Sequence, residues 1–230
     1  MTPKLRVICE IGPKRRVVAG AMDWPGLDRW GRSEDEALDT LAGYLPRYAE
    51  VARCAGQADA FGQARDLEVV ERHPGSSTTD FWGIVHFPSQ IEHEALSSAE
   101  LDRRLALLQA AWDYFDDVAA RVSAELAKGP RGGGRSRDEI IEHVYASERH
   151  NWWRKVGLRT EDGVTLSPEE LAAYRREYVS AIRTFHAEGR QARTWPIQFL
   201  IRRTAQHTMD HAWEMEDKDL GSRPTAAGDR

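Results

Sequence analysis

The chain has 230 residues, a formal net charge of −5 and an isoelectric point near 5.9, a balance that argues against binding along nucleic acid, which usually needs a basic surface. No apolar run approaches a membrane span of about 18 residues, and the start, MTPKLRVICEIGPKRR, lacks the apolar stretch of a signal peptide. The two cysteines, Cys9 and Cys54, have no metal or redox spacing, so we expect a globular cytoplasmic protein with reduced thiols.

The first segments predict a β-hairpin followed by a helix. Residues 5–11 and 16–21 are rich in β-branched side chains and flank the turn signal GPK. Ser33 and Glu36 form a capping box that starts the helix. Pro46 lies inside the helical pattern, so a kink or a break is expected there.

Two further segments complete this first part. Residues 67–71 predict a strand, and residues 81–87 fit either a strand or an irregular connection. Residues 90–96 carry no clear pattern. Residues 1–92 therefore predict an α+β domain.

From residue 97 the sequence predicts four amphipathic helices of roughly 20 residues or more each. Three of them begin with capping boxes, formed by Ser97 with Glu100, Ser136 with Glu139, and Ser167 with Glu170. The first is expected to reach residue 126, before the Gly-rich segment GPRGGGRSR, and the second to reach about residue 156. The third ends near Gly189, and the last, opened by Thr194 and Pro196, ends near Asp217. Residues 97–218 thus predict an all-α four-helix bundle, and residues 219–230 a disordered tail.

The last predicted helix carries two histidines on its inward face. His207 and His211 are one turn apart, and His143 lies on the inward face of the second predicted helix. Imidazole is the commonest metal ligand among side chains, and three imidazoles leave a coordination position open, as in catalytic sites. The three residues predict a divalent metal site, with zinc as the first choice and nickel, iron or manganese as alternatives.

The competing interpretation is that these histidines only pack in the core. Burying three imidazoles without partners costs a few kcal/mol each, which favours a metal over simple packing. His150, seven residues after His143, is an alternative third ligand because it lies on much the same side of the helix.

Other side chains near the histidines are weaker candidates. Glu148 and Glu214 are candidate acid–base catalysts or supports of the metal ligands, although each also suits an ion pair. Asp210, off the inward face, is expected to be solvated. A solvated face is expected for three arginines that otherwise suit an anionic substrate: Arg193, Arg202 and Arg203. A core position, with pocket lining as the alternative, is expected for Trp152, Trp153, Trp195 and Trp213.

Residues 97–218 resemble the DinB superfamily. The resemblance is carried by HVYASERHNWW on the second predicted helix and HTMDH on the last. In that family a histidine near the start of helix two and an HxxxH motif on a later helix bind a divalent metal, which implies His143, His207 and His211. The resemblance also implies metal-dependent transferase, isomerase or hydrolase chemistry on a small molecule. Some members use a low-molecular-weight thiol such as mycothiol or bacillithiol, and bundles of this kind often form homodimers.

The segment MDWPGLDRWGRSEDEAL resembles the HicB-like module, whose pattern is D-x-P-G, then G-x-S/T, then E-A-L. The resemblance covers about residues 1–55 and implies an α/β module, which in antitoxins masks a toxin ribonuclease. The chain lacks the DNA-binding tail of the antitoxins, so operator binding is not expected. A second functional hypothesis follows: a non-catalytic partner-binding or regulatory protein whose bundle serves oligomerisation.

Overall fold

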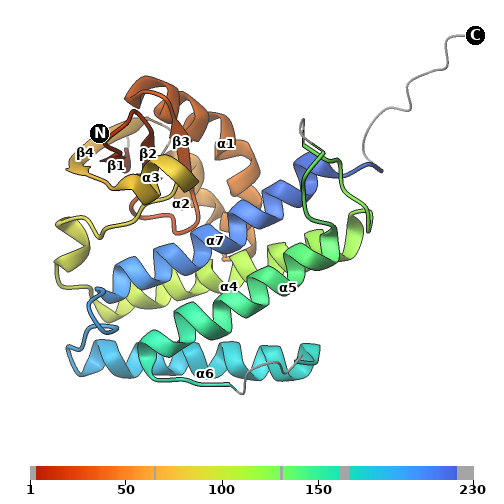
Figure 1. The fold of residues 1–230 in the computed structure, drawn as a ribbon. Coiled ribbons are helices and arrows are strands. Elements are labelled where there is room, and N and C mark those ends of the chain that lie inside the picture. Colours follow the sequence, from red (N-terminus) through yellow and green to blue (C-terminus); the bar gives the residue numbers. More distant parts are fainter. Residues whose placement is uncertain (1–3, 65, 130–131, 161–165, 222–230) are drawn as a thin grey trace, which may run out of the picture.

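The computed structural model describes residues 4–64, 66–129, 132–160 and 166–221. An α/β part at the N-terminus is followed by a helical part (Figure 1). The sheet has four strands: β1 (Leu5–Ile11), β2 (Val17–Ala21), β3 (Asp28–Gly31) and β4 (Leu67–Pro74). Their order is β3-β2-β1-β4, with β4 parallel to β1 and the other pairs antiparallel. The predicted α+β class of the first part is confirmed.

The predicted hairpin is confirmed as β1 and β2, which pair from Val7 with Ala21 to Ile11 with Val17. The edge strand β3 was not predicted. Its four residues, DRWG, are too few to show an alternating pattern, and Trp30 on this strand stays exposed. Pairing with β2 therefore fixes this strand, rather than its own sequence.

Helix α1 (Glu34–Cys54) begins as predicted, because the Ser33 side chain accepts a hydrogen bond from the Glu36 N–H at 3.2 Å. Of the two outcomes expected at Pro46, the break is wrong, because the helix continues through it, and the kink stays a prediction. Burial of its apolar face, including Leu41 and Tyr48, outweighs the backbone hydrogen bond that proline removes.

Short elements connect this part to the long helices. They are α2 (Ala58–Gln63), α3 (Ser77–Trp82) and the 3₁₀ turn η1 (Ile91–His93). Residues 81–87 form no strand, so the irregular alternative is correct there.

The four long helices are α4 (Ser98–Arg121), α5 (Arg137–Ser147), α6 (Pro168–Ala187) and α7 (Ile197–Lys218). All four begin near their predicted starts. Helix α4 ends at Arg121 instead of 126. The α-helix expected up to residue 156 is also wrong beyond Ser147, because a π-helical turn η2 (Glu148–Trp152) and a 3₁₀ turn η3 (Trp153–Val156) replace it. Such π turns insert a residue and change the direction of the side chains that follow.

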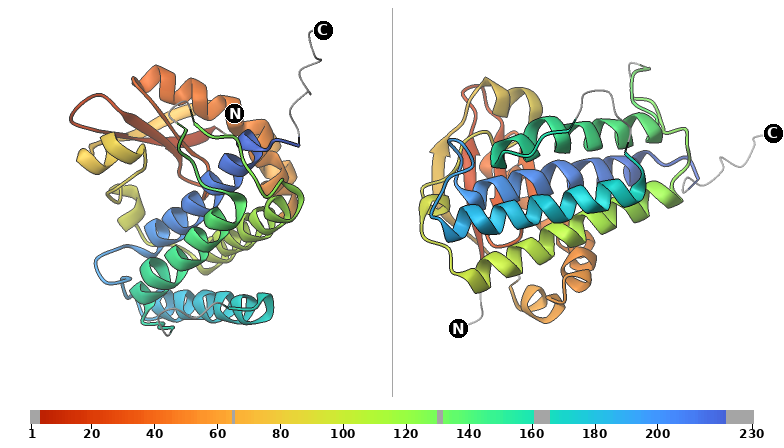
Figure 2. Two further views of the ribbon diagram at one scale, coloured as in Figure 1. Left: turned by 45° about the vertical axis from the view of Figure 1, so that its right-hand side comes forward. Right: turned by 90° about the horizontal axis from the view of Figure 1, so that it is seen from below.

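Helices α4 and α7 both pack toward the α/β part, and α5 and α6 lie farther from it (Figures 1 and 2). One hydrophobic cluster includes Val7 of the sheet, Leu41 of α1, Leu108 of α4, Tyr178 of α6 and Leu200 of α7. The core thus continues across both parts of the chain. The domain limits at 92 and 97 stay a prediction. The disordered tail predicted from residue 219 is wrong for Asp219, which accepts from the Ser123 N–H at 3.0 Å, and residues 222–230 lie outside the described residues.

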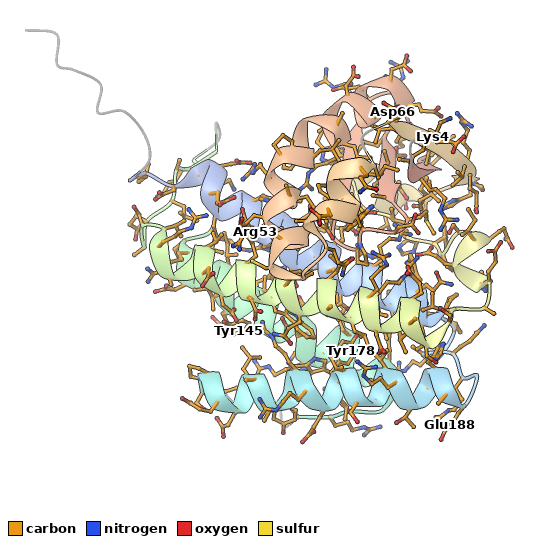
Figure 3. The ribbon with its side chains drawn as sticks, turned by 180° about the vertical axis from the view of Figure 1, so that it is seen from behind. Lys4, Arg53, Asp66, Tyr145, Tyr178 and Glu188 are labelled. Carbon is orange, nitrogen blue, oxygen red and sulfur yellow. The ribbon has the colours of Figure 1, made fainter. Side chains whose placement is uncertain are left out.

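Polar contacts fix the long helices to one another. Tyr178, labelled on α6 in Figure 3, lies 3.0 Å from the Thr204 hydroxyl on α7. Tyr145, labelled on α5, donates to Asp116 of α4 at 3.0 Å. None of the described helices has both the length and the apolar character that a membrane crossing requires.

A buried ion cluster fixes α7 to the α/β part. Arg202 of α7 donates to Asp28 of β3 at 2.7 Å and to both oxygens of Glu92 in η1, at 2.8 and 3.0 Å. All three side chains are fully buried. Gly20 makes this approach possible, since a Cβ there would lie 2.2 Å from an Asp28 oxygen and 3.0 Å from Arg202 Nη1.

Candidate metal centre

Three imidazole rings from α5 and α7 converge. Nε2 of His207 lies 3.2 Å from Nε2 of His143, and one ring nitrogen from each of His143, His207 and His211 lies within 4.8 Å of the others. The structure therefore brings the sequence-predicted triad together. His150, the alternative third ligand, is not part of this cluster among the described residues.

The histidine stripe of α7 changes from buried to half-buried along the helix. Leu200 and Thr204 are fully buried, as the stripe predicts, whereas His207, His211 and Glu214 are half-buried. The ring cluster lies where this stripe leaves the core.

Glu214 orients one of the rings. Its Oε2 lies 2.8 Å from Nδ1 of His211, and Lys218 donates to its Oε1 at 2.5 Å. Because Nδ1 faces this carboxylate, Nε2 of His211 is the nitrogen left for the cluster. A carboxylate that holds the second ring nitrogen is the usual support of a metal-binding histidine.

The charge states of these groups suit metal binding. Burial, followed by the positive charges of His211 and Arg135, lowers the pKa of His143 to about 4. Burial and the neighbouring histidines also lower the pKa of His207 well below its ordinary value. Burial alone would raise the pKa of Glu214, but its bonds with His211 and Lys218 lower it to about 2. At neutral pH, His143 and His207 are neutral, the form that ligates a metal, and Glu214 is ionised.

The spacing of the rings can be compared with that of a tetrahedral zinc site. With Zn–N bonds of about 2.05 Å, two ligand nitrogens lie about 3.3 Å apart, close to the 3.2 Å between His143 and His207. The same distance suits a hydrogen bond between two neutral imidazoles. However, Nδ1 of His207 is buried without a hydrogen-bond partner among the described residues. That nitrogen does not face His143, so the feature that favours a divalent metal is the convergence of ring nitrogens from three histidines, not two.

Trp152 packs beside His207. Its ring is 6% exposed and its centroid lies 6.0 Å from that of His207. The expected core position is confirmed for Trp152, Trp153 and Trp213, and Trp195 is half-buried against Trp152.

Glu148 is placed in an ion pair. Arg175 of α6 donates to its two oxygens at 2.9 and 3.1 Å, and also to Asp116 of α4 at 2.7 Å. Burial raises the pKa of Glu148, and the positive charge of Arg175 opposes that shift. The structure gives Glu148 no contact with the three described histidines, so its carboxylate supports the junction of α4, α6 and η2.

The expectation of a solvated face is wrong for Asp210, Arg202 and Arg203. Asp210 is half-buried and ion-paired with Arg29 of β3, and both arginines are buried. Packing of α7 against the α/β part covers this face, which a periodicity argument on α7 alone does not include. Arg193 is exposed, as expected.

The chain matches no protein-family model, no curated protein and no solved structure.

Proposed function

We propose that this protein is a DinB-like metalloprotein whose helical part is a four-helix bundle that binds a divalent metal ion through His143, His207 and His211. The observation that carries the proposal is the convergence of three rings from two helices, one of them oriented by Glu214. The resemblance of HVYASERHNWW and HTMDH to the DinB motifs supports the same three ligands.

The proposed activity is that of an enzyme acting on a small molecule, by transfer of a low-molecular-weight thiol, isomerisation or hydrolysis. A divalent metal at this site would supply a Lewis acid with an open position for water or a thiol. Glu214 would hold the His211 ring in position and keep its Nε2 free, and Trp152 would exclude water from one side of His207. Zinc is the preferred ion, because it accepts three imidazole ligands readily.

A second candidate function rests on a different surface. Phe81 and Trp82 of α3 are 69% and 64% exposed and contact each other edge to face at 4.6 Å. Large exposed aromatic side chains are typical of protein-binding surfaces. They support the HicB-like alternative, in which the α/β part binds a partner protein and the bundle serves oligomerisation.

Elemental analysis of the untagged protein, purified without added metal, tests the first proposal. We expect about one zinc, nickel, iron or manganese ion per chain, lost in the His207→Ala, His211→Ala double variant. His186→Ala is the matched control, because this half-buried histidine of α6 bonds the Leu96 carbonyl, away from the cluster.

No metal in the wild type, even after equilibration with divalent ions, would contradict the metalloprotein proposal. A co-purifying protein that is lost on Phe81→Ser, Trp82→Ser substitution would then favour the partner-binding function.

A further inference from the structure

Arg203 is a buried cation that makes no ion pair with a described carboxylate. Its side chain is 7% exposed, and among the described residues its hydrogen bond joins Nη1 to Oε1 of Gln206. It forms no ion pair with a carboxylate of the described residues. Burial lowers its pKa to about 10, which still leaves it charged at neutral pH. Unpaired buried charges are costly, so such a residue calls for an explanation.

The acidic groups around Arg203 already pair with other side chains. Gln206, which accepts from Arg203, donates its amide to Asp210 at 3.3 Å. Asp210 is itself ion-paired with Arg29. The neighbouring Arg202 takes the charges of Asp28 and Glu92. Asp28, Asp210 and Glu10 attract Arg203 at longer range, but no carboxylate of the described residues forms an ion pair with it.

Arg203 lies beside the histidine cluster. It precedes His207 by one helical turn, so both side chains lie on the same side of α7. Its guanidinium carbon lies 5.7 Å from the centroid of Trp152, the ring that contacts His207.

We infer that Arg203 binds an anionic group, a carboxylate or phosphate, of the small molecule that reaches the three histidines. The guanidinium fork can hold two oxygens of such a group. The ring of Trp152 beside it would shield the guanidinium and the bound anion from water on that side. The ligand is therefore an organic anion, with the charged end at Arg203 and its reacting end at the His143–His207–His211 cluster. The role given to the three histidines rests on the proposed function. The binding of the anion by Arg203 does not.

The test measures thermal unfolding of the full chain with inorganic phosphate or with acetate, in the presence of a chelator. The chelator excludes binding of the probe to a metal, so the result does not depend on the metalloprotein proposal. At an excess of 100-fold over the dissociation constant, we expect at least one probe to raise the unfolding midpoint by about 5 °C or more. Arg203→Met should abolish this shift, and Arg203→Lys should reduce it, because lysine keeps the charge but not the fork.

Two measurements separate a binding role from a structural one. Without probe, Arg203→Met should unfold within about 2 °C of the wild type or above it, because it removes an uncompensated charge. Arg190→Met is the matched control for general anion effects, because Arg190 lines a separate basic pocket of about 720 Å³ with Lys155, Arg159 and Arg193. This variant should keep the full probe shift.

Three results would overturn the inference: no shift in the wild type with either probe, an equal shift in Arg203→Met, or loss of the shift in Arg190→Met alone. A low unfolding midpoint of Arg203→Met, together with an unchanged probe shift in Arg203→Lys, would likewise make Arg203 structural.

Discussion

Two polar clusters on α7 differ in how their buried groups are satisfied. Near the start of the helix, Arg202 is neutralised by Asp28 and Glu92, which together accept three hydrogen bonds from its guanidinium. One turn later, His207 meets two other imidazoles, and one of its nitrogens has no partner among the described residues. The first, satisfied cluster pairs opposite charges and stabilises the fold, whereas the second, unsatisfied one brings three imidazole nitrogens together, an arrangement that suits a metal.

The largest expected effect is at the satisfied cluster. Arg202→Met leaves two buried carboxylates without their cation, so we expect a loss of about 3–5 kcal/mol in the free energy of unfolding. Urea denaturation measures it, with Arg190→Met, at an exposed ion pair with Glu188, as the control. A loss below about 1 kcal/mol would show that this cluster does not hold α7 to the α/β part.

Glu10 of β1 is another buried carboxylate with hydrogen-bond partners. We expect the free energy of unfolding to depend on its protonation. Burial alone would raise its pKa, but hydrogen bonds from His73, Thr79 and the N–H groups of His86 and Phe87 lower it. Its stabilising contribution is therefore present above about pH 4.3, the unfolded value, and is lost as the pH falls through the lowered folded value.

Glu10→Gln should remove about 1–3 kcal/mol at pH 7 and flatten the decline of stability below pH 4.3. Denaturation curves from pH 3 to 7 measure both quantities. An equally steep acid decline in the variant would assign that decline to other carboxylates.

At the histidine cluster, a substitution of Glu214 tests whether its carboxylate supports metal binding. Glu214→Gln keeps the shape of the side chain but weakens its hold on His211 Nδ1, so we expect metal affinity to fall about 10–100-fold. Competition with a chromophoric chelator measures the change. Glu214→Gln with unchanged affinity would separate this carboxylate from the site and leave it as a partner of Lys218 alone.

The smallest effect is expected from removing a histidine in metal-free protein. His143→Leu should change the free energy of unfolding by less than about 1 kcal/mol in the presence of a chelator, because leucine replaces the apolar packing of the ring and the lost hydrogen bond joins two half-buried histidines. The same variant should lose the stabilisation that added zinc gives the wild type. A large loss without metal would make the ring cluster structural, like Arg202.

The sequence predicts features that depend on neighbouring residues. Ser97 and Ser167 cap their helices by accepting from the residues three positions on, at 3.1 and 3.2 Å, and these starts were predicted correctly. The histidine stripe was predictable for the same reason, since helical periodicity places His207 and His211 on one face.

Features fixed by distant partners were not predictable. Arg202 is buried because of Glu92 and Asp28, which precede it by 110 and 174 positions. The π turn at Glu148 accompanies a pair with Arg175, 27 positions away. The sequence places Arg203 one helical turn before His207, and this position was predictable. Its burial, with no ion pair to a described carboxylate, follows only from the packing of α7 against the α/β part.

Calorimetric titration of zinc into the metal-free protein tests the central claim most directly, that the unsatisfied cluster on α7 is a metal site. The account predicts saturation at about one zinc per chain, abolished by His143→Ala and by His207→Ala and retained in His150→Ala. No binding by the wild type, or binding that His143→Ala and His207→Ala leave unchanged, would contradict it.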